Sequence, residues 1–216
     1  MHRTQSLRRC SIAVAMAMSL LAWPAISDAQ LGGLLPAPTT STTPTVVGNA
    51  SAAQVSVLGI LGTAMTTALA GTGTLSGVND SRYAAAITGS APPLSAETLS
   101  AATISWVNEV DSEASLTNLS MTVAGVGITA DLVMAQASQV AGAAGRGSST
   151  LSNLSINGTP VAVTGLPNQA IWIPGGQAII NEQAISSTGT AVVNALHVTV
   201  TGVADVVIAS ATAGIS

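Results

Sequence analysis

His197 is the only histidine in the chain apart from His2. Proton-transfer chemistry near neutral pH would depend on it, because imidazole is the side chain that titrates there. Asp205 lies eight residues further on, across an expected hairpin, and could neighbour the ring. A hydrolase that uses Glu182, His197 and Asp205 is one interpretation, but it also needs a positioned nucleophile, and the chain has no Gly-x-Ser-x-Gly motif. We favour a strand histidine that is exposed or hydrogen-bonded, and expect no catalytic residue.

Glu182 is unusual because it lies in a run of isoleucines. A carboxylate in apolar surroundings needs a hydrogen-bonding or charged partner. The candidate partners are Arg146, Asn194 and His197. We expect a structural hydrogen bond or ion pair here.

Three acids at a spacing of two residues form the one charge cluster: Glu109, Asp111 and Glu113. On a strand they would share one face, and in a loop they could converge on Ca²⁺, which prefers several oxygen ligands. The three acids are not accompanied by the glycine-containing turn that shapes calcium-binding loops. A solvated acidic segment is therefore favoured over a metal site. The sequence predicts no cofactor.

Trp172 is one of three aromatic residues beyond residue 30, with Tyr83 and Trp106. It lies beside a Pro-Gly-Gly turn and could be a surface platform for a sugar, yet an indole buries much area, so a packed core position is favoured. A carbohydrate- or peptide-binding module is therefore an alternative function. Such a module would use Trp172 or the acids of 109–113. The candidate ligand-binding residues are Trp172, Glu182, Asn194, His197 and Asp205.

Turn signals divide the C-terminal half into short strands. Asn157-Gly158 between apolar runs is a strong hairpin signal, because both turn positions need a positive φ. Further turns are expected at Pro174-Gly175-Gly176, Ser187-Thr188-Gly189 and Gly202. The predicted strands are 150–157, 159–164, 169–173, 177–185, 191–201 and 203–212. Such short connections predict an antiparallel meander.

Alternation within 191–201 assigns faces to this strand. One face would carry Val192, Asn194, Leu196, Val198 and Val200, and the more polar face would carry Val193, Ala195, His197, Thr199 and Thr201. Segments 95–107 and 130–144 fit both helical and strand periods, and their Val, Ile and Thr content favours strands. The predicted class is all-β, an antiparallel sandwich or meander, with room for one short helix in the N-terminal half.

Residues 1–29 have the features of a cleaved secretory signal: a basic start, an apolar run at 11–22, and small residues Ser27 and Ala29 before the cleavage point. This predicts export by the Sec route, with no membrane anchor after cleavage. Residues 30–48 are predicted to be a flexible Pro/Thr/Ser leader, and 49–216 a single β-rich domain.

Charge is scarce, at 6% of residues, and only Arg82 and Arg146 are basic beyond residue 29. Nucleic acids are recognised through clustered Lys and Arg, so this class of partner is excluded. No cysteine lies beyond Cys10, so no disulfide is expected. Few charges also favour self-association, or association with a cell-envelope component.

Several spaced elements of the C-terminal half occur in the order seen in an exported bacterial family. They are Asn153, Asn157, Gly158 and Pro160; Pro167 and Asn168; Asn181, Glu182 and Gln183; Asn194, Ala195, His197 and Val198; and Ala204, Asp205, Val206, Val207 and Ala209. Through them the chain resembles the choice-of-anchor P family. The resemblance implies an exported, β-rich surface or matrix domain without known catalytic activity.

These observations predict a non-enzymatic domain, extracellular or at the cell surface, with a role in surface structure, matrix or adhesion. The carbohydrate- or peptide-binding module is the first alternative, and the secreted hydrolase is the second.

Overall fold

A computed structural model describes residues 43–58 and 64–216 of the chain. The regular structure of these residues consists of strands. No helix forms within these residues, so the predicted all-β class is confirmed and the short helix is not found there. The strands are β1 (Val46–Leu58), β2 (Ala64–Gly71), β3 (Ser81–Ala91), β4 (Leu94–Ser105), β5 (Glu109–Val123), β6 (Val126–Val140), β7 (Arg146–Ser152), β8 (Ser155–Ile156), β9 (Thr159–Pro160), β10 (Gln169–Ile173), β11 (Gly176–Ile185), β12 (Ala191–Val200) and β13 (Ala204–Ile215).

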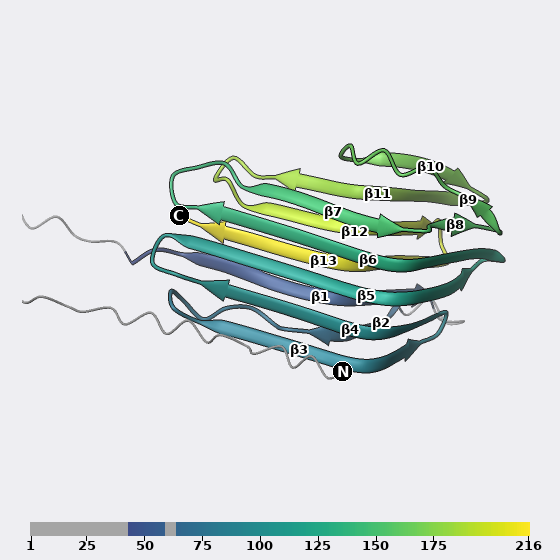
Figure 1. Cartoon of the computed structure of the whole chain (residues 1–216), viewed down its shortest axis with the longest axis horizontal. Helices are drawn as coiled ribbons and strands as arrows, with labels where there is room; N and C mark the ends of the chain where they lie inside the picture. The colour runs from purple at the N-terminus through teal and green to yellow at the C-terminus, as the bar shows by residue number, and fades with distance from the viewer. Residues whose placement is uncertain (1–42, 59–63) are drawn as a thin grey trace, which may run out of the picture. The chain divides into compact units, whose positions relative to one another are not determined.

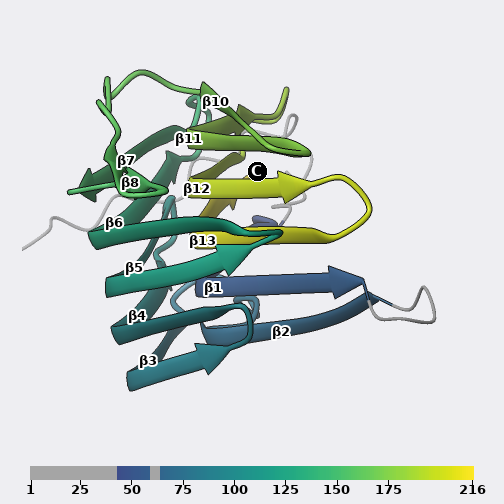
Figure 2. The ribbon, with the colours of Figure 1, turned by 90° about the vertical axis from the view of Figure 1, so that its right-hand side faces the viewer.

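The strands form two antiparallel sheets. Sheet A has the order β10-β11-β12-β13-β1-β2, and sheet B has the order β3-β4-β5-β6-β8-β9, with β7 also paired to β6. The chain leaves sheet A after β2 and returns to it after β9, so that the last strand pairs with the first (Figure 1). Figure 2 shows the sheets as two layers, and the strands of both run in similar directions, as in an aligned sandwich.

Small side chains fill the space between the sheets. Many buried residues are alanines and valines, and no aromatic residue is among the buried side chains of the described part of the chain. The largest fully buried side chains include Leu94, Leu99, Leu116, Leu119, Met121, Ile128, Ile180, Leu196 and Ile208. The two segments with mixed periodicity, 95–107 and 130–144, contribute β4 and β6 to this core, so the preference for strands is confirmed.

Gln139 ties the two sheets together at one end of the sandwich. Its side chain is 2% exposed. The amide nitrogen Nε2 donates to the carbonyl oxygens of Ala143 and Thr188, each at 3.0 Å, and the amide oxygen accepts from the backbone N–H of Ile215 at 2.9 Å. A buried polar group must be hydrogen-bonded to be tolerated, and this one satisfies three backbone groups at once.

Alternation breaks once in β12, which corrects the predicted faces. Ala195 and Leu196 are consecutive and both buried. Residues 196–201 keep the predicted faces, but before the break the faces exchange, so that Val193 is buried and Val192 is not. Asn194 and His197 therefore share the outer face of sheet A, where the prediction had them on opposite faces.

The break continues in the neighbouring strands. The register leaves Asn181, Ala195 and Ala209 unpaired, although the residues on either side of each are paired. Asn181 and Ala209 have φ angles of 53° and 51°, a left-handed conformation that is uncommon for residues with a Cβ. The pairing also skips Ala52 and Ala70, so a line of irregularities crosses sheet A from β11 to β2, and it sets which side chains meet on the outer face.

The predicted turns are present. Asn157 and Gly158 have φ angles of 50° and 74° and join β8 to β9. Gly175 and Gly202 also have positive φ, at 78° and 71°, in the turns before β11 and β13. The strand predicted over 159–164 is wrong beyond Pro160, because only β9 forms there.

The predicted leader overlaps the fold. Residues 46–48 belong to β1, where Gly48 is buried and a Cβ on it would overlap Leu75 and Thr103. The sheet therefore begins at Val46 and not at residue 49. The predicted signal segment, with Ser27 and Ala29, and the leader up to residue 42 lie outside the described residues.

Candidate functional site

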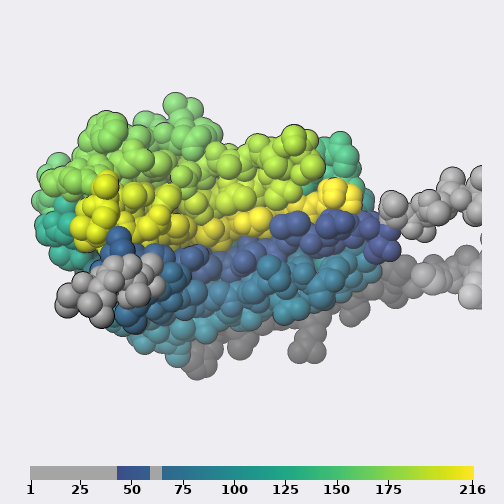
Figure 3. All heavy atoms as spheres, turned by 180° about the vertical axis from the view of Figure 1, so that it is seen from behind, coloured from purple at the N-terminus to yellow at the C-terminus, as the bar shows by residue number. Residues whose placement is uncertain are grey.

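The five candidate ligand-binding residues all lie on strands of sheet A and none is fully buried. Trp172 is on β10, Glu182 on β11, Asn194 and His197 on β12, and Asp205 on β13. Figure 3 shows the side of the molecule where β13, in yellow, runs beside β1, in dark blue.

Both nitrogens of the His197 ring face carboxylates. Nδ1 lies 2.9 Å from Oε2 of Glu182, and Nε2 lies 3.0 Å from Oδ1 of Asp205. The predicted proximity of His197 to Asp205 across the hairpin is confirmed. Glu182 Oε2 also accepts from Nδ2 of Asn194 at 2.6 Å, so two of its three expected partners are present. Arg146, the third, lies on β7 in the other sheet.

This arrangement sets the charge of the imidazole. Burial on its own would lower the pKa of His197. The hydrogen bond that the ring donates to Glu182, the negative charge of Glu182, and the charge and accepting oxygen of Asp205 outweigh burial and raise the pKa above its usual value. A ring between two carboxylates is satisfied only when both nitrogens carry hydrogen. The geometry therefore favours the protonated ring, an imidazolium that donates to both carboxylates.

An imidazolium is poorly suited to general base catalysis, because it has no lone pair to accept a proton. The hydroxyl of Thr199 lies 3.3 Å from Nε2, so an oxygen nucleophile is near. Asp205 occupies the same nitrogen at a shorter distance. The group of Glu182, His197 and Asp205 has the form of a structural ion triad on a sheet face.

Trp172 does not pack in the core, and the favoured interpretation of this residue is wrong. Its side chain is 81% exposed on β10, an edge strand of sheet A. The physical reason is the phase of β10: Ile173 takes the inward position, so its neighbour Trp172 points to the outer face. The indole therefore stands on the outer surface, as the platform interpretation expects.

The acidic cluster lies on one face of β5, as expected for a strand. Glu109, Asp111 and Glu113 alternate with the buried residues Val110 and Ser112. Strand geometry separates successive members by about 7 Å, and no group of three or more His, Cys, Asp or Glu that could hold a metal ion occurs in the described residues. The calcium site is not assembled in these residues. The pKa of Asp111 is raised, mainly by burial of its carboxyl and to a smaller extent by the negative charge of Glu109.

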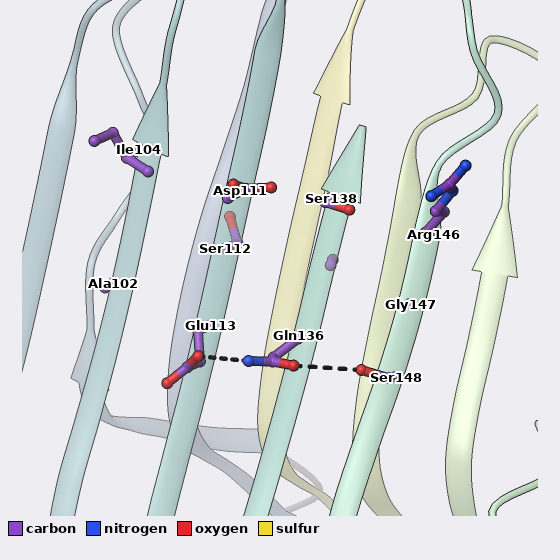
Figure 4. Close-up of a pocket in the computed structure, with 11 residues that line it drawn as sticks. Ala102, Ile104, Asp111, Ser112, Glu113, Gln136, Ser138, Arg146, Gly147 and Ser148 are labelled. Carbon is purple, nitrogen blue, oxygen red and sulfur yellow. Dashed lines mark hydrogen bonds between the residues drawn. The ribbon is translucent and has the colours of Figure 1, made fainter. Parts of the chain in front are cut away.

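A shallow hollow of about 520 Å³ covers this acidic face of sheet B. Figure 4 shows a chain of hydrogen bonds across it, in which Gln136 Nε2 donates to Glu113 at 2.7 Å and Ser148 Oγ donates to Gln136 Oε1 at 3.4 Å. Arg146 stands at the rim on β7. Sequence reasoning missed Gln136 and Ser148, because their meeting depends on the register between β5, β6 and β7.

Sequence reasoning also missed a pair of carboxylate–amide contacts on sheet B. Asn118 Nδ2 donates to Glu97 at 2.8 Å, and Asn153 Nδ2 donates to Asp131 at 2.6 Å. Both asparagines have positive φ, at 50° and 53°. Asparagine tolerates this conformation better than most residues, and that preference was the available signal.

Comparison of the chain with protein-family models, with curated proteins and with solved structures finds no match. The resemblance to the choice-of-anchor P family therefore stays a prediction. Among the described residues, no helix has the length and apolar character needed to cross a membrane.

Proposed function

We propose that this chain is an exported, non-enzymatic β-domain that acts in surface structure, matrix or adhesion by associating with copies of itself. The observation that carries the proposal is the edge of sheet B at β3, which has a strand on one side only among the described residues. The scarcity of charge and the resemblance to the choice-of-anchor P family support the same function and a location outside the cell or at its surface.

The β3 edge is long and carries little charge. In the described part of the chain, β3 pairs only with β4, and its eleven residues include one charge, Arg82. The pairing skips Ile87 and Thr98, so one irregularity interrupts the edge. Tyr83 and Ile87 on this strand are 71% and 87% exposed. Natural sheets block such edges with lysine, proline, bulges or very short strands, because unpaired backbone groups recruit another strand. The prolines 92 and 93 lie beyond the end of β3, in the turn to β4.

The second free strand on this flank is β2, the edge of sheet A, which contacts β3 (Figure 2). Its eight residues, AMTTALAG, contain no charge and no proline, and Met65 is 72% exposed. The opposite edge strand of sheet A, β10, has only five residues. Two long neighbouring edges on one flank favour strand addition there between copies of the chain.

The chemistry of His197 supports a non-enzymatic role. A general base must be unprotonated at working pH, whereas the two flanking carboxylates favour the protonated ring. The hydrolase alternative would require Asp205 to move away from Nε2 before Thr199 could donate its proton.

Self-association is tested by placing lysines on the edge. The double variant Ala85→Lys with Ile87→Lys puts two positive charges on β3, and like charges meet when two such edges pair. Light scattering after size-exclusion chromatography should show association of the unmodified protein and a monomer for the variant at the same concentration.

The matched control carries the same two charges at the same spacing on an interior strand, as Ser120→Lys with Thr122→Lys on β5, where both positions are exposed. It should associate like the unmodified protein. A monomeric unmodified protein at high concentration, or association that survives the edge lysines, would contradict the proposal.

A further inference from the structure

One row of side chains crosses the whole outer face of sheet A. Trp172, Gln177, Thr199, Asp205, Ser56 and Thr66 are consecutive register partners on β10, β11, β12, β13, β1 and β2. None of the six is buried. An indole is thus followed by an amide, a hydroxyl, a carboxylate and two more hydroxyls, at the strand spacing of about 4.8 Å.

We propose that this row binds an uncharged polysaccharide, with Trp172 stacking on a sugar ring and the polar side chains bonding to its hydroxyls. An exposed indole offers a large rigid apolar surface at small entropic cost. The amide of Gln177 and the hydroxyl of Thr199 can each both donate and accept hydrogen bonds, as sugar hydroxyls also do. This inference goes beyond the proposed self-association, which uses strand edges, because the row lies on the outer face of sheet A and reaches the β2 edge only at Thr66.

The polar groups of the row are partly committed, and the free atoms face outward. Asp205 uses Oδ1 for His197, which leaves Oδ2 as an acceptor, and its side chain is 56% exposed. Ser56 and Thr66 share one hydrogen bond at 2.9 Å. Beside Thr199, Asp205 and Ser56 lies a hollow of about 210 Å³, which gives the row depth at its centre.

The charges on this face of sheet A restrict the ligand to an uncharged polysaccharide. Among the described residues, His197 is the one basic side chain near the row, and it already lies between Glu182 and Asp205. Arg82 and Arg146, the basic residues of the described part of the chain, are both on strands of sheet B. An anionic polysaccharide would meet the carboxylate of Asp205 without a compensating charge.

Retention on insoluble cellulose, chitin and xylan tests the proposal, with polygalacturonate as the anionic comparison. Protein expressed from the full sequence should be retained by at least one of the uncharged polymers. Trp172→Ala should weaken that retention by about ten-fold or more, as expected when an aromatic anchor is truncated. Trp172→Tyr should restore most of it, because a tyrosine ring also stacks.

Trp106→Ala is the matched control, because Trp106 is 41% exposed between β4 and β5, away from the row. It should leave retention unchanged, and circular dichroism should show that each variant is folded. The edge variant of Ala85 and Ile87 should still be retained, which separates this inference from self-association. No retention on the three uncharged polymers, equal retention of Trp172→Ala, or stronger binding to polygalacturonate would overturn it.

Discussion

Raising the pH above neutrality should destabilise the folded protein through one group, His197. Beyond residue 29 the chain has no lysine, no cysteine and no other histidine. The pKa of His197 is raised in the folded state because Glu182 and Asp205 outweigh the effect of burial. The unfolded ring titrates near its ordinary pKa of about 6.5.

The sign follows from the protons bound in each state. Below about pH 6.5 both states carry the imidazole proton, and the triad contributes its full stability. Between the unfolded and the folded pKa the native state binds more protons than the unfolded state. Stability therefore falls as pH rises, with a slope of up to about 1.4 kcal/mol per pH unit, and levels off above the folded pKa.

Urea unfolding at pH values from 6 to 9, with the unmodified protein and His197→Gln, measures this effect. The variant keeps every other titrating group, so the difference in unfolding free energy between the two proteins isolates His197. That difference should be largest at pH 6 and shrink towards pH 9. A titration of the His197 ring by NMR should give a pKa above 6.5. A difference that stays constant or grows with pH would refute the imidazolium triad.

Two predictions concern the stability of the sandwich that positions the site. Gln139→Ala removes three hydrogen bonds to backbone groups, of which the N–H of Ile215 is buried, and should lower the unfolding free energy by about 2–4 kcal/mol. Gln136→Ala, at an exposed glutamine on the same strand, should change it by about 0.5 kcal/mol or less. Equal urea midpoints for the two variants would contradict this. Gly176→Ala places a Cβ onto a backbone carbonyl of β12 and should lower the unfolding free energy by about 1–3 kcal/mol. Gly142→Ala is the comparison, because its Cβ would meet nothing nearby but its φ is 77°. It should lower the unfolding free energy by about 1 kcal/mol, from backbone strain alone.

Local chemistry explains what the sequence could predict. The hairpin at Asn157-Gly158 and the turn at Gly202 depend on a few adjacent residues that need positive φ. The Gly202 turn also fixes the pairing of β12 with β13, which is why the proximity of His197 and Asp205 could be expected. The pattern of Val, Ile and Thr similarly predicted the strands of the sandwich.

The phase of alternation within a strand and the register between strands explain what the sequence could not predict. One irregular residue reverses the faces of a strand, and nothing in the run around Ala195 or Ala209 marks where that happens. The position of Asn194 beside His197 depends on this break. The exposure of Trp172 was also unexpected, because indoles tend to be buried, and it follows from the phase of β10, in which Ile173 takes the inward position.

The two proposed activities use separate surfaces of the sandwich. Association through β2 and β3 would occupy one flank, and Trp172 lies on β10, at the opposite edge of sheet A. A copy added at β2 would meet the Thr66 end of the polar row and leave the indole uncovered. Because the row runs perpendicular to the strands, strand addition extends the sheet in the direction of the row. Assembly and polysaccharide binding are therefore compatible in one molecule, and a variant that abolishes one should leave the other intact.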